Sequence, residues 1–258
     1  MIGEFLNFLR GKSAPAVASQ RRKLFFDEAP DHIYAIGDVH GCDDMLGRLE
    51  DLIFEDSRNR QGAKWLIMLG DYVDRGPKSA SVMDRLTSRP RADIKRICLA
   101  GNHEDVMLDF FHNPSADHRW LDFGGLETLY SYGLHKIPSN RHALKNALLA
   151  RFPDEHLTFL ETLPSLVSVP GYCFVHAGIR DGVRLAEQDD ADLLWLRPGA
   201  DEKRVATNDF VIVHGHTPVS NVEIGADRIN LDTGAFMSGV LSAVRLSGRN
   251  APEIIQCS

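Results

Sequence analysis

The sequence predicts an α/β fold, and two observations carry this prediction. In the first half of the chain, three short apolar runs alternate with stretches of helical periodicity. Each unit is about 30 residues long, as a strand–helix–strand crossover requires. The final third instead contains short β-rich runs separated by glycine, proline and Asn-Asp turns. We therefore expect a parallel sheet in the first half and further strands near the end, with helices around them.

The composition is that of a globular protein. The chain has 258 residues, 43% hydrophobic and 25% charged, with a net charge of −7. These values exclude a collagen, a fibrous repeat and a largely disordered chain. The acidic balance also argues against binding to a nucleic-acid duplex. Four widely spaced cysteines without a C-x-x-C pair predict reduced thiols and a cytoplasmic location, and no apolar run is long enough for a transmembrane segment.

Residues 1–30 are predicted to form an N-terminal extension that is flexible or amphipathic. Its first residues place an apolar set near one helical face, namely Ile2, Phe5, Leu6, Phe8 and Leu9. The following residues 13–23 are small and then basic, which is typical of a linker. The extension is too short and wrongly flanked to be a signal peptide. We expect the rest of the chain, residues 31–258, to form a single domain.

Each of the three apolar runs ends in a polar motif and leads into a helix. Ile33–Ile36 precedes GDVHG, Trp65–Leu69 precedes GDYVDRG, and Ile94–Ala100 precedes GNHE. In the second unit Pro77 suits the first position of the helix. Right-handed crossovers would make the three strands parallel, so that their carboxyl ends share one edge. In open α/β sheets ligands bind at that edge.

The second half of the chain is predicted to be helical first and then β-rich. Residues 111–163 have helical character, and Pro153 with Asp154 and Glu155 begins the last helix of this part. The expected strands of the final third are Leu166–Val169, Tyr172–Val175, Phe210–Val213, Ile229–Leu231 and Gly239–Leu246.

Polar side chains gather at the predicted strand ends, and their types suit a metal site. They are Asp38, His40, Asp71, Asn102, His103, His176 and His216. Carboxylate, amide and imidazole together favour divalent manganese, iron or zinc. Asp38 and His40 lie two residues apart, so they point the same way on an extended segment. Asp71, from the neighbouring strand, would bridge two ions about 3.5–4 Å apart, and such a pair can clamp a phosphate.

The motifs GDVHG, GDYVDRG, GNHE, HAG and GHTP occur in this order. Together they resemble the phosphoprotein phosphatase (PPP) family of calcineurin-like metallophosphoesterases, with the bacterial and phage Ser/Thr phosphatase branch as the nearest match. The resemblance covers residues 33–248. It implies a calcineurin-like fold of two packed mixed β-sheets flanked by helices, with a dinuclear metal site at the carboxyl ends of the strands. It also makes residues 31–258 one metallophosphoesterase catalytic domain and implies two divalent ions, Mn²⁺ before Fe or Zn²⁺.

The resemblance also assigns a role to each motif residue. The implied metal ligands are Asp38, His40, Asp71, Asn102, His176 and His216. The implied phosphate-binding residues are Arg75, Asn102, His103 and Arg197. His103 would protonate the leaving alkoxide and Asp74 would orient it, while a hydroxide bridging the two metals attacks phosphorus in line.

Several positions keep two interpretations. His214 and His216 both lie in HGHTP, and the Gly-His-Thr match favours His216 as the ligand. Glu104 is expected behind the ligands or at a helix start. The segment 120–133 resembles a recurring segment of bacterial family members, and its Gly124-Gly125 pair either lets a loop approach the site or ends a helix.

The function that this resemblance favours is hydrolysis of phosphomonoesters on proteins, at phosphoserine or phosphothreonine and also at phosphotyrosine. The alternative is a symmetrical dinucleoside tetraphosphate (Ap4A-type) or RNA-cap phosphoanhydride hydrolase on the same scaffold, with a nucleotide polyphosphate as substrate. Those enzymes typically lack the aspartate of VDRG, which is present here as Asp74. A third hypothesis, a phosphate-binding module without catalysis, predicts missing ligands, whereas each expected position is filled.

Overall fold

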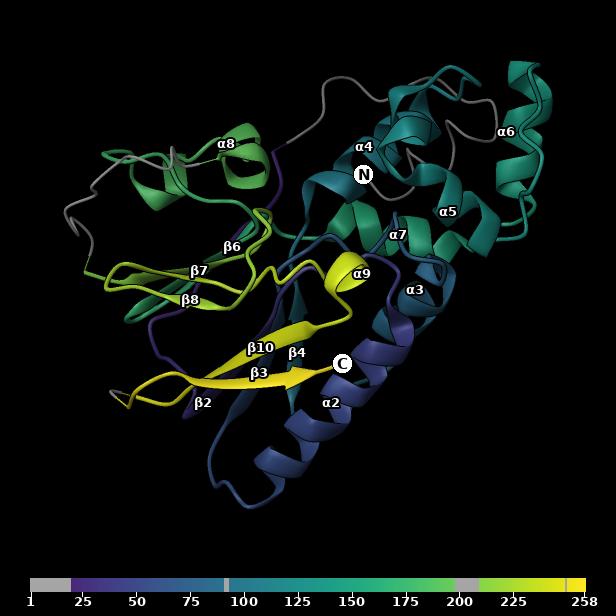
Figure 1. Cartoon of the computed structure of the whole chain (residues 1–258). Coiled ribbons are helices and arrows are strands. Elements are labelled where there is room, and N and C mark those ends of the chain that lie inside the picture. Colours follow the sequence, from purple (N-terminus) through teal and green to yellow (C-terminus); the bar gives the residue numbers. More distant parts are fainter. Residues whose placement is uncertain (1–19, 91–92, 198–208, 249) are drawn as a thin grey trace.

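The computed structural model describes residues 20–90, 93–197, 209–248 and 250–258 (Figure 1). Two β-sheets form its centre. The first has the strand order β11-β10-β2-β3-β4, and the second has the order β1-β5-β6-β7-β9-β8. The strands of the first sheet are β2 (His32–Ile36), β3 (Lys64–Met68), β4 (Lys95–Cys98), β10 (Leu241–Leu246) and β11 (Glu253–Cys257). Those of the second are β1 (Lys23–Phe25), β5 (Leu166–Val169), β6 (Tyr172–Val175), β7 (Val211–His214), β8 (Glu223–Ile224) and β9 (Arg228–Asn230).

The predicted parallel arrangement of the first three strands is confirmed. β2 pairs with β3, and β3 with β4, in parallel register. β10 returns antiparallel to β2 and makes this sheet mixed. The second sheet is mixed as well, since β6 runs parallel to β7 and antiparallel to β5. The architecture is therefore the predicted α/β arrangement of two mixed sheets with helices.

Helices cover the outer faces of both sheets (Figure 1). The larger helices are α2 (Asp43–Arg58), α3 (Ser79–Thr87), α4 (Asn102–His112), α6 (Arg141–Leu149) and α7 (Asp154–Thr162). The shorter ones are η1 (Arg119–Phe123), α5 (Gly125–Ser131), η2 (Leu185–Glu187), α8 (Asp190–Trp195) and α9 (Ala235–Ser238). In Figure 1, α2 lies along the sheet of β2, β3 and β10, whereas α8 lies over β6 and β7. No helix in the described ranges combines the length and apolar character needed to cross a bilayer.

Strand β2 shows why the predicted strands are continuous apolar runs. Ile33 and Ala35 belong to the cluster buried between the two sheets, where Phe174 and Val213 of the second sheet also lie. Tyr34 and Ile36 belong to the cluster on the opposite face, under the helices. A strand covered on both faces gains by being apolar at every position instead of alternating.

Most strands begin or end one or two residues away from the sequence-based expectation, and so does the second helix. The second helix begins at Ser79 and not at Pro77, because the backbone N–H of Lys78 donates to the carbonyl of Gly41 and keeps this stretch in a turn. Residues 20–30 lie within the predicted extension, yet Lys23–Phe25 form β1 and pair in parallel with β5. The amphipathic residues 2–9 lie outside the described residues.

Candidate metal centre

The loops that leave the carboxyl ends of β2, β3, β6 and β7 meet the start of α4, and the polar motif residues lie where they meet. These side chains are Asp38, His40, Asp71, Asn102, His103, His176 and His216, each at most 6% exposed. Burying this many polar groups is unfavourable unless they have partners. The cluster therefore needs a chemical explanation beyond folding.

Two groups of side chains present converging donor atoms. His40, Asp71 and His103 form one group, and Asp71, His176 and His216 form the other, with the donor atoms of each group within 4.8 Å of one another. Asp71 belongs to both groups, which is the position predicted for a bridging ligand. Its Oδ2 lies 3.5 Å from His40 Nε2, and its Oδ1 lies 3.4 Å from His176 Nε2.

Asn102 adds an amide oxygen to the second group. The Asn102 Oδ1 atom lies 2.9 Å from both His176 Nε2 and His216 Nδ1. His214 instead places its Nδ1 atom 3.0 Å from the Gly215 carbonyl oxygen, and it belongs to neither group. The geometry thus supports the choice of His216 over His214.

Asp38 departs from the expected arrangement. Its two carboxylate oxygens accept hydrogen bonds from the His216 backbone N–H at 3.2 and 3.1 Å. The converging group around His40 and Asp71 contains His103 where Asp38 was expected. The backbone at Gly215 lies close to Asp38, since a Cβ atom on Gly215 would lie 2.0 Å from Asp38 Oδ1.

The electrostatics of the cluster fit a site for divalent cations. Burial, together with Asp232 and Asp71, raises the pKa of Asp38 well above its usual range. Burial lowers the pKa of His40 and of His216 to about 3, so both imidazoles are neutral. Burial opposes ionisation of Asp71 as well, but three neighbouring imidazoles hold its pKa below the usual range. An ionised Asp71 and a buried Asp38 beside these imidazoles are a donor set that a divalent cation compensates, and cation binding would release the proton of Asp38.

An unpaired buried nitrogen, His103 Nε2, also fits a site for divalent cations. His103 Nε2 is buried without a hydrogen-bond partner and lies 3.9 Å from Asp71 Oδ2. Its ring is held from the other side, where Nδ1 contacts Asp74 Oδ2 at 2.6 Å. Burial opposes charge on His103, but Asp71 and Asp74 raise its pKa above the usual value. The ring is therefore held with its Nε2 atom inside the cluster, toward Asp71.

The backbone at the site is unusual. Among the described residues, the non-glycine residues with positive φ are His40, Asp71, Asp74, Arg75 and His216. Each belongs to the predicted site. Left-handed backbone at such residues is uncommon and costs on the order of 1–3 kcal/mol each. The surrounding structure must stabilise these conformations, and they cluster where the proposed chemistry takes place.

Glu104 stabilises the GDYVDRG loop from behind. Its carboxylate accepts hydrogen bonds from the backbone N–H groups of Asp71, Tyr72, Val73 and Gly101, at 2.8–3.3 Å. Burial raises its pKa to about 7, with the charge of Asp71 acting in the same direction. Glu104 thus lies behind the cluster and in the first turn of α4, so both of its sequence interpretations hold. The number of backbone groups that it binds could not be inferred from GNHE.

Two arginines reach the cluster. Arg75 Nη1 lies 3.2 Å from His40 Nε2, and Arg197 Nε lies 3.4 Å from His216 Nε2. Each guanidinium therefore contacts one of the converging groups. A planar fork of N–H donors suits phosphate oxygens.

Replacing Arg75 by alanine should raise the inhibition constant for inorganic phosphate and lower kcat/KM. Loss of a hydrogen bond to a charged group is worth about 1.5–3 kcal/mol, or roughly 10–100-fold. Both constants can be measured by steady-state kinetics. Arg58→Ala, at an exposed ion pair on α2, is the matched control and should change neither. Unchanged phosphate inhibition in Arg75→Ala would remove Arg75 from the phosphate site.

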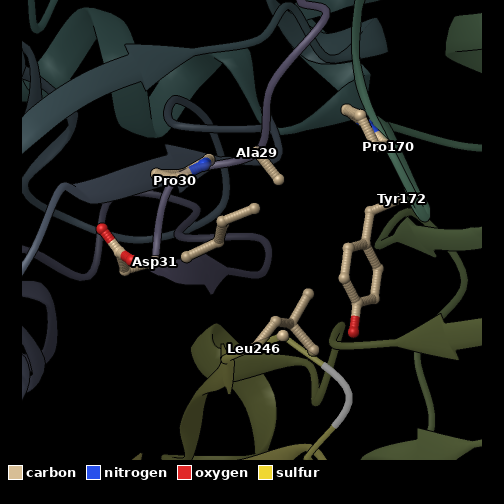
Figure 2. A pocket seen from close by; sticks show the side chains of 8 residues that line it. Ala29, Pro30, Asp31, Pro170, Tyr172 and Leu246 are labelled. Carbon is tan, nitrogen blue, oxygen red and sulfur yellow. The ribbon is translucent and has the colours of Figure 1, made fainter.

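Figure 2 shows a separate pocket. It is lined by residues that include Pro30, Asp31, Pro170, Tyr172 and Leu246. Tyr172 begins β6, whereas His176 follows the end of this strand, so the pocket and the cluster lie at opposite strand ends. Asp31 already accepts a hydrogen bond from the Ala63 N–H. The lining therefore does not resemble a catalytic site.

Comparison with known protein families agrees with a metal site at this cluster. A family model described as calcineurin-like phosphoesterase matches residues 32–235. The chain belongs to this family, so the resemblance inferred from the motifs is confirmed. Calcineurin-like phosphoesterases use a dinuclear divalent metal site, and the two converging groups described above are candidates for it. The protein is thus a phosphoesterase of the hydrolase class.

Individual relatives fall into two substrate groups. Serine/threonine-protein phosphatase 2 of Salmonella typhimurium is 29% identical over 224 residues, which cover 83% of this chain and 93% of the relative. The asymmetrical bis(5'-nucleosyl)-tetraphosphatase PrpE of Anoxybacillus flavithermus is 27% identical over 229 residues, covering 81% and 88%. A serine/threonine phosphatase structure from Saccharomyces cerevisiae has a TM-score of 0.57 at 14% identity, covering 99% of this chain and 87% of that one. The bacterial phosphatase supports membership of the PPP family, and the yeast structure shows the same fold.

Proposed function

We propose that this protein is a metal-dependent phosphomonoesterase that acts on phosphorylated proteins or peptides, at serine or threonine and also at tyrosine. One observation carries the proposal. Asp74 of the VDRG motif is fully buried and contacts His103 Nδ1 at 2.6 Å. A carboxylate in this position orients the imidazole as a general acid for a leaving alkoxide, which needs a proton.

The residues of the site would bind metal ions, bind the phosphate or donate a proton. Asp38, His40, Asp71, Asn102, His176 and His216 would hold two divalent ions, for which Mn²⁺ is the first candidate. Such ions activate water and neutralise phosphate charge. Arg75 and Arg197, with Asn102, would hold and orient the phosphate oxygens. As water forms the new P–O bond and the ester P–O bond breaks, the bond's electron pair stays on the leaving oxygen, and that oxygen takes the proton from His103 Nε2.

Hydrolysis of dinucleoside tetraphosphates is the second candidate function. The relative PrpE is named for the asymmetrical form of this activity, not the symmetrical form expected from the sequence, and it matches the chain over a similar length to the named phosphatase. A phosphate or polyphosphate leaving group needs less protonation than an alkoxide. The His103–Asp74 pair is therefore more useful for a phosphoserine or phosphothreonine ester, which is why we prefer the first function. A cytoplasmic location remains part of the proposal for either substrate.

A side-by-side assay distinguishes the two candidates. Metal-stripped protein with Mn²⁺ restored is offered a phosphothreonine peptide and a dinucleoside tetraphosphate, with Asp71→Asn as the inactive reference. We expect a higher kcat/KM on the peptide, measured by phosphate release, and no turnover above background in the variant. Preferential cleavage of the nucleotide, measured by chromatography of the products, would replace the first function by the second.

A further inference from the structure

The segment that runs from η1 into α5 binds the aspartate of the acid pair. Trp120 Nε1 donates to Asp74 Oδ2 at 2.8 Å, and Thr128 Oγ1 donates to Asp74 Oδ1 at 2.7 Å. The same Oδ2 contacts His103 Nδ1. Both oxygens of the carboxylate thus have a partner from residues 119–131, and the plane of the carboxylate is fixed.

The same segment also contacts the side chains of His103 and Arg75. The ring of Phe123 stacks on the ring of His103, with centroids 4.3 Å apart and an interplanar angle of 13°. The Arg75 guanidinium carbon lies 5.8 Å from the centroid of the Phe123 ring. The imidazole is therefore fixed at its edge by Asp74 and at its face by Phe123.

Gly124 allows this close approach. Its carbonyl accepts the Arg75 backbone N–H at 3.1 Å, and its φ is 107°. A Cβ atom there would lie 2.8 Å from the Arg75 nitrogen and 3.2 Å from the Asp74 Cβ atom. Both interpretations of the Gly124-Gly125 pair hold, since Gly124 ends η1 and also lets the chain approach the site.

We propose that Trp120, Phe123 and Thr128 are positioning residues for proton donation to the leaving group. This inference rests on the proposed role of His103 as general acid. Trp120 and Thr128 keep the Asp74 carboxylate in the plane that holds His103, and Phe123 prevents the imidazole from tilting. With the ring fixed in this way, Nε2 faces the reacting phosphate.

Proton donation predicts a dependence on the leaving group that simple destabilisation does not. Phenyl phosphate and p-nitrophenyl phosphate have almost the same shape, but phenolate is the poorer leaving group and needs the proton more. We expect Thr128→Val to lower kcat about 10-fold more on phenyl phosphate than on p-nitrophenyl phosphate, as part of the roughly 10²–10⁴-fold contribution of a general acid. Trp120→Phe should act in the same direction, because it removes the indole N–H and retains an aromatic ring.

Three controls accompany these variants. Thr128→Ser keeps the hydroxyl and should restore the wild-type ratio of the two kcat values. Trp65→Phe changes a tryptophan that packs on Phe26 away from the site and should leave the ratio unchanged. Metal content and Tm are measured for every variant, so that loss of ions or of folded protein is detected directly.

The His103→Asn variant separates failure of this inference from failure of the proposed role of His103. Suppose that His103→Asn lowers kcat more on phenyl phosphate than on p-nitrophenyl phosphate, whereas Thr128→Val and Trp120→Phe lower kcat equally on both. The positioning role is then wrong and the acid role stands. If His103→Asn also lowers kcat equally on the two substrates, the acid role itself is wrong, and so is the inference that rests on it.

Discussion

Replacing Asp71 by asparagine should abolish hydrolysis and metal binding together. Asp71 is the one side chain shared by the two converging groups, and its two oxygens face different histidines, His40 and His176. An amide offers one neutral oxygen in place of two charged ones, so it cannot serve both groups. Changes to residues behind metal ligands already reduce affinity or activity by 10–100-fold, so we expect a loss in kcat of more than about 10²-fold for a ligand.

The measurement is metal content per chain, determined after dialysis against limiting Mn²⁺, together with kcat on a phosphopeptide. Asp44→Asn is the matched control, because this exposed aspartate pairs with Lys78 at the surface of the same region. Exposed ion pairs of this kind contribute little, and the control should bind two ions and keep its activity. An Asp71→Asn protein that still binds two ions would show that Asp71 is not the bridge.

The fold was predictable to the extent that its strands are apolar on both faces. β5 and β6 begin and end at the residues expected from the sequence. β11 was not predicted, since it is an edge strand whose residues are mostly exposed or half-buried and carry no apolar pattern. β1 and β8 have only three and two residues, too few for any periodicity.

The site was predictable where residues follow strands and not where contacts come from distant helices. Asp71, His103 and His176 lie where the motifs and the strand order place them. Trp120 lies 46 positions after Asp74 in the sequence, and Thr128 lies 54 positions after it, yet both contact its carboxylate. No spacing rule reaches that far. The left-handed backbone of the site residues likewise depends on surrounding hydrogen bonds and not on local propensity.

The second large effect is expected for His103→Asn, which should slow turnover while the protein keeps both ions. The imidazole is linked to Asp74 through Nδ1 at 2.6 Å, and its Nε2 has no hydrogen-bond partner in the described part of the chain. Asparagine cannot deliver a proton from that position. The expected decrease in kcat is about 10²–10⁴-fold, the usual contribution of a general acid.

Metal content decides between this role and direct ligation. His103 lies in the converging group with His40 and Asp71, so the distances alone also permit it to bind an ion. A ligand lost at this position would reduce the number of bound ions from two to one, whereas a lost acid would leave two. The link to Asp74 favours the acid, because Asp71 and Asp74 together raise the pKa of the imidazole and Asp74 holds the ring through Nδ1. Retention of both ions with a large loss of kcat would therefore establish His103 as the proton donor.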